Sequence, residues 1–238
     1  MDEVYEYCVR MLGPGAVAIH ASHEAFVAGG SDRIDRLAGA VRACRSRAEE
    51  AGPGVGVEAA RAGGSSAPAG EVRADQGPET LADAVAREVA EATAQLPADQ
   101  REALALRDLV GLSHEQIARV LETDDEQARL LVARARVALR SKRRGVPQEP
   151  EDACPDRVRA LSLMVRRQDR EAVDEQDEDW LLEHLGSCES CLRVHAAMLE
   201  ASACYRAWRT PDPAATRPGA RGRVGAGASN EAVRDAVQ

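Results

Sequence analysis

The chain has 238 residues, of which 44% are hydrophobic but only 3% aromatic, and its formal net charge is −9 at pH 7. Much of the apolar content is alanine, so large apolar side chains are too few for one continuous large core, and strand-forming residues are few. Composition therefore predicts an all-α fold of small helical domains joined by flexible linkers, and the charge excludes a uniformly basic nucleic-acid-binding surface.

Targeting and cysteine content indicate the compartment. No apolar run reaches the roughly 18–20 residues of a membrane span, and the acidic N-terminus does not have the form of a signal peptide. Six cysteines are too few for a disulfide scaffold. We therefore expect a cytoplasmic protein without a membrane partner, whose cysteines are free thiols or metal ligands.

Composition divides the chain into helical blocks and segments with little to bury. The predicted divisions are a helical block at 1–50, a Gly/Ala/Pro/Ser-rich flexible linker at 51–78, a helical block at 79–145, a second helical block at 153–209 and a disordered tail at 210–238.

The block at 79–145 has the pattern of a helix-turn-helix. Ser113 and Gln116 have the capping-box spacing that begins a short helix, and after Thr123 a longer basic helix follows, which we expect to run to about Lys142. Seven basic residues and no acidic one lie between Arg129 and Arg144. At helical spacing Arg129, Arg136, Arg140 and Arg143 share one stripe. That stripe is either a DNA-contacting face or an ordinary solvated face.

The sequence LPADQREALALRDLVGLSHEQIARVLETDDEQARLLVARARVALR resembles region four of the sigma-70 family, specifically its extracytoplasmic-function (ECF) group. The resemblance implies recognition of a promoter element and contact with RNA polymerase. The DNA-binding residues expected on the basic helix are Arg129, Arg134, Arg136 and Arg140, as holders of phosphates and base edges.

The N-terminal segments EVYEYCVRML, HEAFV and RIDRLAGAVRACRSRA are similar to a shortened region two of the same family. There, Glu24, Phe26 and Val27 occupy the position of the helix that binds core RNA polymerase. The alternative interpretation is that this segment is a small helical hairpin with no role of its own.

The strongest chemical signal is the spacing His184-x3-Cys188-x2-Cys191. Its three side chains fall on successive helical turns, and a tetrahedral zinc needs four such ligands. We expect Cys154 to be the fourth, with His195 as the spare candidate. A closed Cys3His set predicts a structural zinc rather than a catalytic one. The remaining cysteines, Cys8, Cys44 and Cys204, are interpreted as small apolar fillers.

The segment CPDRVRALSLMVRR, an acidic spacer and WLLEHLGSCESCLRVHAAM resemble a zinc-binding anti-sigma domain, which clamps sigma regions and in some members loses zinc on thiol oxidation. A redox-sensitive zinc is therefore one alternative here. The acidic run 174–179 predicts either a solvated helix start or a surface that covers the arginine stripe and blocks DNA.

We therefore expect a divergent ECF-type sigma factor that binds core RNA polymerase and promoter DNA and is regulated in cis by its zinc-binding domain. The alternative is an anti-sigma-like or protein-binding regulator that does not read DNA, with another sigma factor as its partner. The net charge and the acidic start of the basic helix, Asp124 to Glu126, favour the alternative. An enzyme is not expected, since no nucleophile–base pair or phosphate-binding glycine loop is present.

Overall fold

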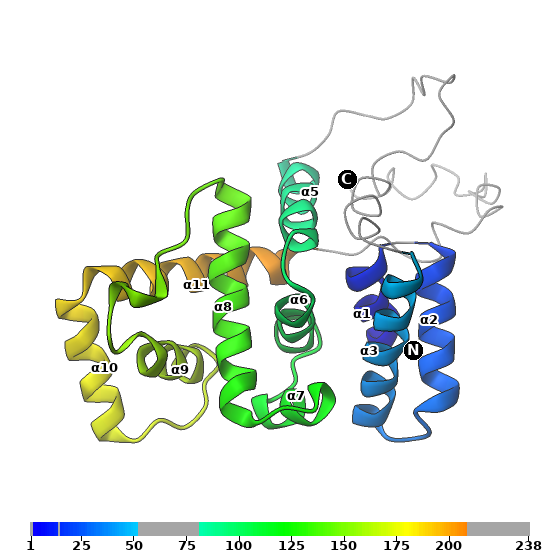
Figure 1. Cartoon of the computed structure of the whole chain (residues 1–238), viewed down its shortest axis with the longest axis horizontal. Coiled ribbons are helices and arrows are strands. Elements are labelled where there is room, and N and C mark those ends of the chain that lie inside the picture. Colours follow the sequence, from blue (N-terminus) through cyan, green and yellow to red (C-terminus); the bar gives the residue numbers. More distant parts are fainter. Residues whose placement is uncertain (1, 14, 52–80, 209–238) are drawn as a thin grey trace, which may run out of the picture.

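The computed structural model describes residues 2–13, 15–51 and 81–208, and every regular element in these ranges is a helix (Figure 1). The predicted all-α fold is confirmed. The predicted linker at 51–78, apart from its first residue, and the predicted tail at 210–238 lie outside the described residues. Within the described ranges, no helix combines the length and apolar character that crossing a membrane requires.

The first three helices pack together as a bundle. They are α1 (Asp2–Leu12), α2 (Ala16–Ala28) and α3 (Arg33–Ala51). Ala18, Ala21 and Ala25 are the buried residues of α2, and side chains of this size let α3 approach closely. At the turn after α2 the approach is closer still, because a Cβ on Gly29 would lie 2.5 Å from the Cα of Arg36. Small residues thus form the packing face of α2, whereas α1 and α3 bury larger side chains such as Tyr7 and Leu37.

The middle block contains five helical elements that end in the basic helix. They are α5 (Leu81–Ala94), α6 (Ala98–Leu104), the π-helix η1 (Ala105–Leu109), α7 (His114–Leu121) and α8 (Asp125–Arg144). Ser113 caps α7 in a full capping box with Gln116. Glu122 ends α7 in the left-handed conformation, and the Asp124 carboxylate accepts a hydrogen bond from the Gln127 amide at 2.8 Å to begin α8. The capping residues therefore place the starts of α7 and α8 where the helix-turn-helix prediction expects them.

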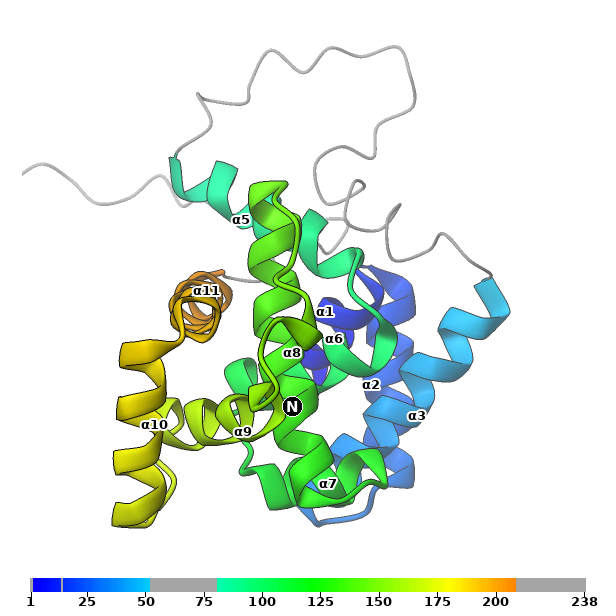
Figure 2. The same cartoon turned by 60° about the vertical axis from the view of Figure 1, so that its left-hand side comes forward.

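The last block, which we call the C-terminal unit (residues 149–208), packs against the middle block. Its elements are the 3-10 turn η2 (Glu151–Ala153), α9 (Arg157–Gln168), α10 (Glu175–Ser187) and α11 (Glu189–Ala207). Helix α8 contacts α9 and α11 on one side and α5, α6 and α7 on the other. Figure 2 shows α8 between these two groups, with α10 on the outside.

Buried apolar residues form one cluster that extends from α1 through α7 and α8 to α11, and a second cluster lies where α5, α8 and α11 meet. The expectation that no large continuous core forms is therefore wrong. The expectation rests on the small number of large apolar side chains. Buried alanines such as Ala103, Ala133 and Ala160 fill the close contacts between helices, so the core is continuous without many large side chains.

Candidate nucleic-acid and metal sites

The basic helix α8 of the helix-turn-helix is largely covered by neighbouring helices. From Ala128 to Ser141 no residue of this helix is exposed, and Gln127 and Lys142 are the nearest exposed residues at its two ends. A recognition helix reads DNA by laying its side chains in the major groove. In the arrangement described here, no stretch of α8 between these two residues is fully exposed, and its most accessible side chains are half-buried.

The arginines predicted to bind DNA are all paired with carboxylates. Arg136 is entirely buried, and its Nε and Nη2 donate to Asp108 at 3.0 and 2.8 Å while Nη2 also donates to Asp169 at 2.8 Å. Arg134 donates to both oxygens of Glu151, at 2.7 and 3.1 Å. The helical stripe did not predict that Arg136 faces the interior.

The other two predicted arginines lie at opposite ends of α8. Arg129 pairs with Asp125 of its own helix and lies 3.4 Å from Glu171 of the C-terminal unit. At the other end, Arg140 Nε donates to Glu200 of α11 at 3.4 Å. The same carboxylate accepts from Arg143 and, at 2.6 and 2.8 Å, from Arg144. One glutamate of the C-terminal unit thus engages three arginines of α8.

A buried ionic cluster, formed by Arg107, Asp108, His114, Arg136 and Asp169, joins the middle block to the loop between α9 and α10. Asp169 is fully buried, 2.9 Å from Arg107 Nε and 3.3 Å from His114 Nε2. Burial alone would raise the pKa of Asp169, but the nearby His114, Arg136 and Arg107 hold it well below its usual value. This carboxylate is therefore ionised at neutral pH and serves as the common partner of three cationic or polar groups.

Glu171 and Arg206 extend this cluster on either side. The Glu171 Oε1 lies 2.5 Å from His114 Nδ1, and burial is outweighed by His114 and Arg129, so the pKa of Glu171 is lowered. Arg206 of α11 donates to Asp108 at 2.8 Å. Sequence analysis missed all of these partners, because each joins segments far apart in the chain. The only local signal was charge within otherwise apolar helices.

The acidic run 174–179 does not cover the arginine stripe. Asp177 pairs with Arg159 at 2.7 Å and Glu178 with Arg167 at 3.4 Å, and both arginines belong to α9. The prediction that residues 174–179 cover the arginine stripe is therefore wrong, because α10 packs against α9 and α11 rather than against α8 (Figure 2). Isolated acids elsewhere in the C-terminal unit contact α8 instead.

Four side chains with metal-binding atoms meet in the C-terminal unit. The ligand atoms of Cys154, His184, Cys188 and Cys191 all lie within 4.8 Å of one another. Cys154 follows η2, His184 is in the last turn of α10, Cys188 is the junction between α10 and α11, and Cys191 is in the first turn of α11. This Cys3His cluster could hold one metal ion, and the spare candidate His195 is not part of it.

Neighbouring groups orient the cluster and supply positive charge. The Trp180 ring stacks on His184 with centroids 4.8 Å apart. Buried Arg157 donates to Ser190 at 2.6 Å and lowers the pKa of Cys191 electrostatically, although burial is the larger effect and raises that pKa to about 12. Backbone amide groups at Cys191 and Ser190 lower the pKa of Cys188. Arg157 and these amide groups thus favour the thiolate forms, but burial keeps the pKa of Cys191 high, so a thiolate at Cys191 depends on the charge of a bound dication.

The residues predicted to bind polymerase lie on α2 at the molecular surface. Val27 is 74% exposed and Phe26 37% exposed, with the Arg36 guanidinium 5.1 Å from the Phe26 ring centroid. Glu24 lies 3.3 Å from Arg47 of α3. An apolar pair beside charged groups is therefore accessible on this helix.

Comparison with protein families gives a match to the family described as Sigma-70, region 4, over residues 86–139. The comparisons with curated proteins and with solved structures gave no match. The matched segment includes most of α5, all of α6, η1 and α7, and α8 as far as Leu139. Sigma-70 region 4 is a domain of transcription initiation that interacts with promoter DNA and RNA polymerase, and it is not an enzyme domain. Residues 86–139 of the chain are therefore similar to a sigma-70 region 4 domain.

Proposed function

We propose that the chain is a divergent ECF-type sigma factor that binds core RNA polymerase and promoter DNA, and that its own C-terminal unit holds region 4 closed. The closed arrangement is the one in which α9 and α11 cover α8. The observation that carries the proposal is the absence of any exposed residue on α8 between Ala128 and Ser141. Reading of DNA then requires that the C-terminal unit move off α8.

The contacts that would have to break are mostly ionic. Glu171 and Glu200 of the C-terminal unit engage arginines at the two ends of α8, and Asp169 engages Arg136 at its middle. DNA phosphates compete for the same guanidinium groups, since both are oxyanions that accept bidentate hydrogen bonds. Ion pairing therefore makes the closed arrangement stable without DNA and reversible in its presence.

Zinc is the metal that the cluster fits best. Three thiolates and one imidazole are soft or borderline ligands, and a closed tetrahedral set of this kind is typical of structural zinc. Bound zinc would fix α10, α11 and the start of α9 relative to one another through Cys154, His184, Cys188 and Cys191. With three thiolates and one dication the centre carries a single negative charge, which buried Arg157 offsets.

Retention of core RNA polymerase tests the sigma assignment. The full-length, zinc-loaded protein is expected to co-purify with core polymerase, and Val27→Glu is expected to abolish retention because it places a carboxylate in the exposed apolar patch of α2. Val17→Glu is the matched control, since Val17 is also exposed on α2, at 50%, but lies near the other end of the helix. Equal retention of both variants, or no retention of the wild type, would reject the proposal.

A second candidate is a protein-binding regulator that does not read DNA and acts on another sigma factor. It is favoured by the complete pairing of Arg129, Arg134, Arg136 and Arg140 with carboxylates of the chain. Binding to duplex DNA at increasing salt distinguishes the two. A DNA reader loses affinity steeply as salt rises, whereas a protein that makes no phosphate contacts shows no specific salt-dependent binding.

A further inference from the structure

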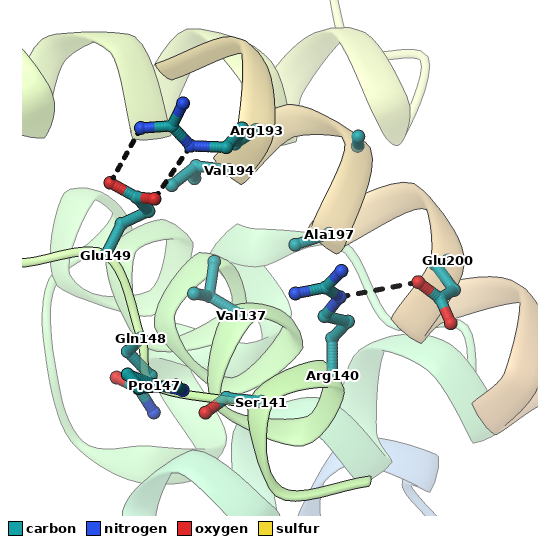
Figure 3. A pocket seen from close by; sticks show the side chains of 11 residues that line it. Val137, Arg140, Ser141, Pro147, Gln148, Glu149, Arg193, Val194, Ala197 and Glu200 are labelled. Atoms are coloured by element: carbon teal, nitrogen blue, oxygen red, sulfur yellow. Dashed lines mark hydrogen bonds and ion pairs between the residues drawn. The ribbon is translucent and has the colours of Figure 1, made fainter. Parts of the chain in front are cut away.

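A pocket of about 180 Å³ lies where α8, the connecting segment 145–150 and α11 meet (Figure 3). Its apolar wall is formed by Val137 of α8 with Val194 and Ala197 of α11. The pocket therefore spans the two helices that must separate if region 4 is to open.

The acidic groups at this pocket already have partners. Glu149 accepts hydrogen bonds from Arg193 at 2.8 Å and from Ser190 at 2.9 Å. Glu200 accepts from Arg143 and Arg144 in addition to Arg140. Neither carboxylate is left to attract a cationic ligand.

Arg140 is different, because only its Nε is used. That atom donates to Glu200 at 3.4 Å, and within the described part of the chain Nη1 and Nη2 make no hydrogen bond. Figure 3 shows one Nη atom directed toward Val137 and the other toward Ala197, with the dashed line to Glu200 drawn from Nε alone. The pocket thus combines a free pair of guanidinium donors with an apolar wall.

This combination selects a small carboxylate. Two parallel N–H donors match the two coplanar oxygens of a carboxylate. The apolar wall favours a short hydrocarbon body, and the volume is well below the roughly 300 Å³ at which pockets for drug-sized ligands begin. A phosphate dianion fits less well, since it has no hydrocarbon body to cover the apolar wall of Val137, Val194 and Ala197.

We propose that this pocket binds a small aliphatic carboxylate, held by the Nη atoms of Arg140 against Val137, Val194 and Ala197. The ligand contacts α8 and α11 at once, so it binds the closed arrangement and shifts the equilibrium toward it. The regulatory consequence rests on the proposed function, whereas the binding itself does not.

The test uses the full-length, zinc-loaded protein with isovalerate as the probe. Saturation-transfer NMR followed by titration is expected to detect isovalerate binding. Arg140→Lys keeps the charge but removes the paired donors, and Ala196→Met fills the pocket from an exposed position on α11. Each is expected to weaken binding at least about tenfold. Arg167→Lys, the same exchange on α9 outside the pocket, is the control and is expected to leave isovalerate affinity unchanged.

Two further ligands refine the assignment. L-valine that competes with isovalerate identifies an amino acid as a source of the same carboxylate chemistry, and failure of L-valine to compete restricts the site to simple carboxylic acids; both results support the site. Binding of inorganic phosphate as tight as that of isovalerate would overturn the assignment. Absence of isovalerate binding up to about 10 mM, or equal binding by the wild type and the Arg140→Lys and Ala196→Met variants, would also overturn it.

Duplex-DNA binding in the presence of isovalerate separates this inference from the proposed function. A lower DNA affinity is expected when isovalerate is bound. Isovalerate binding that depends on Arg140 but leaves DNA affinity unchanged would keep the pocket and reject closed-state regulation.

Discussion

Asp169→Asn removes the central negative charge of the buried ionic cluster. The side chain is fully buried and contacts Arg136 at 2.8 Å, Arg107 at 2.9 Å and His114 at 3.3 Å. Asparagine has the same shape but no charge, so Arg136 keeps only Asp108 as a partner, and Arg107 loses its carboxylate. Breaking a buried ion pair from one side costs about 3–5 kcal/mol, because a buried charge is left uncompensated.

The expected loss at the lower end of that range, about 3 kcal/mol, corresponds to a fall in Tm of roughly 6–12 °C for a chain of this size. Thermal unfolding followed by circular dichroism of the full-length, zinc-loaded protein measures it. The control is Asp177→Asn, which removes a carboxylate paired with Arg159 on the surface of the same unit and is expected to cost less than about 1 kcal/mol.

The same residue gives a pH signature. The pKa of Asp169 is lower in the folded protein than in the unfolded chain, so its contribution to stability is fully present above the unfolded value of about 4 and is lost as pH falls below it. Acidification from about pH 5 to about pH 3 should therefore destabilise the wild type more than the Asp169→Asn variant. Equal Tm shifts for Asp169→Asn and Asp177→Asn, or identical pH profiles for wild type and Asp169→Asn, would refute the reasoning about the cluster.

Two further changes test the metal cluster and the contact between the first and last described helices. Cys191→Ser removes one of the four candidate ligands and is expected to lower zinc content from about one ion per chain to near zero by elemental analysis. Cys204→Ser lies outside the cluster and should leave the zinc content unchanged. Retention of zinc by Cys191→Ser would contradict the site. The Arg10 guanidinium lies 3.4 Å from the Trp208 ring centroid and donates to the Trp208 carbonyl oxygen. Arg10→Gln is therefore expected to lower the free energy of unfolding in urea by about 1–2 kcal/mol and to change the fluorescence of Trp208. An unchanged fluorescence spectrum and an unchanged urea midpoint would contradict this contact.

The features that the sequence predicted correctly depend on short spacings. The capping box of Ser113 and Gln116 fixes where α7 begins, and the His184, Cys188 and Cys191 spacing brings three ligand atoms together through one helix end and the next helix start. Cys154 could be predicted only because a tetrahedral zinc site needs a fourth ligand. Spacing of this kind is local, so it survives whatever tertiary arrangement the blocks adopt.

The buried ionic cluster could not be predicted in this way. A helical wheel places Arg136 on a basic stripe. It does not show that Asp108, 28 residues earlier in the sequence, and Asp169, 33 residues later, both lie against the Arg136 guanidinium in the fold. The wheel also treats a stripe as exposed by default, whereas two groups of helices cover α8 from opposite sides. Which acidic residues meet the arginines depends on the packing of α9 and α11, and that information is non-local.

The most direct test of the closed arrangement is the duplex-DNA affinity of a full-length, zinc-loaded variant in which two partly exposed carboxylates of the C-terminal unit, which pair with arginines of α8, are neutralised. Glu171→Gln with Glu200→Gln should raise the affinity at least about tenfold, with a steeper salt dependence, because guanidinium groups at both ends of α8 become free for phosphates. Asp177→Asn with Glu178→Gln removes the same charge from acids that pair with α9, and should change little. Equal affinities for the two double variants would contradict the account, because the gain would then reflect net charge rather than release of α8.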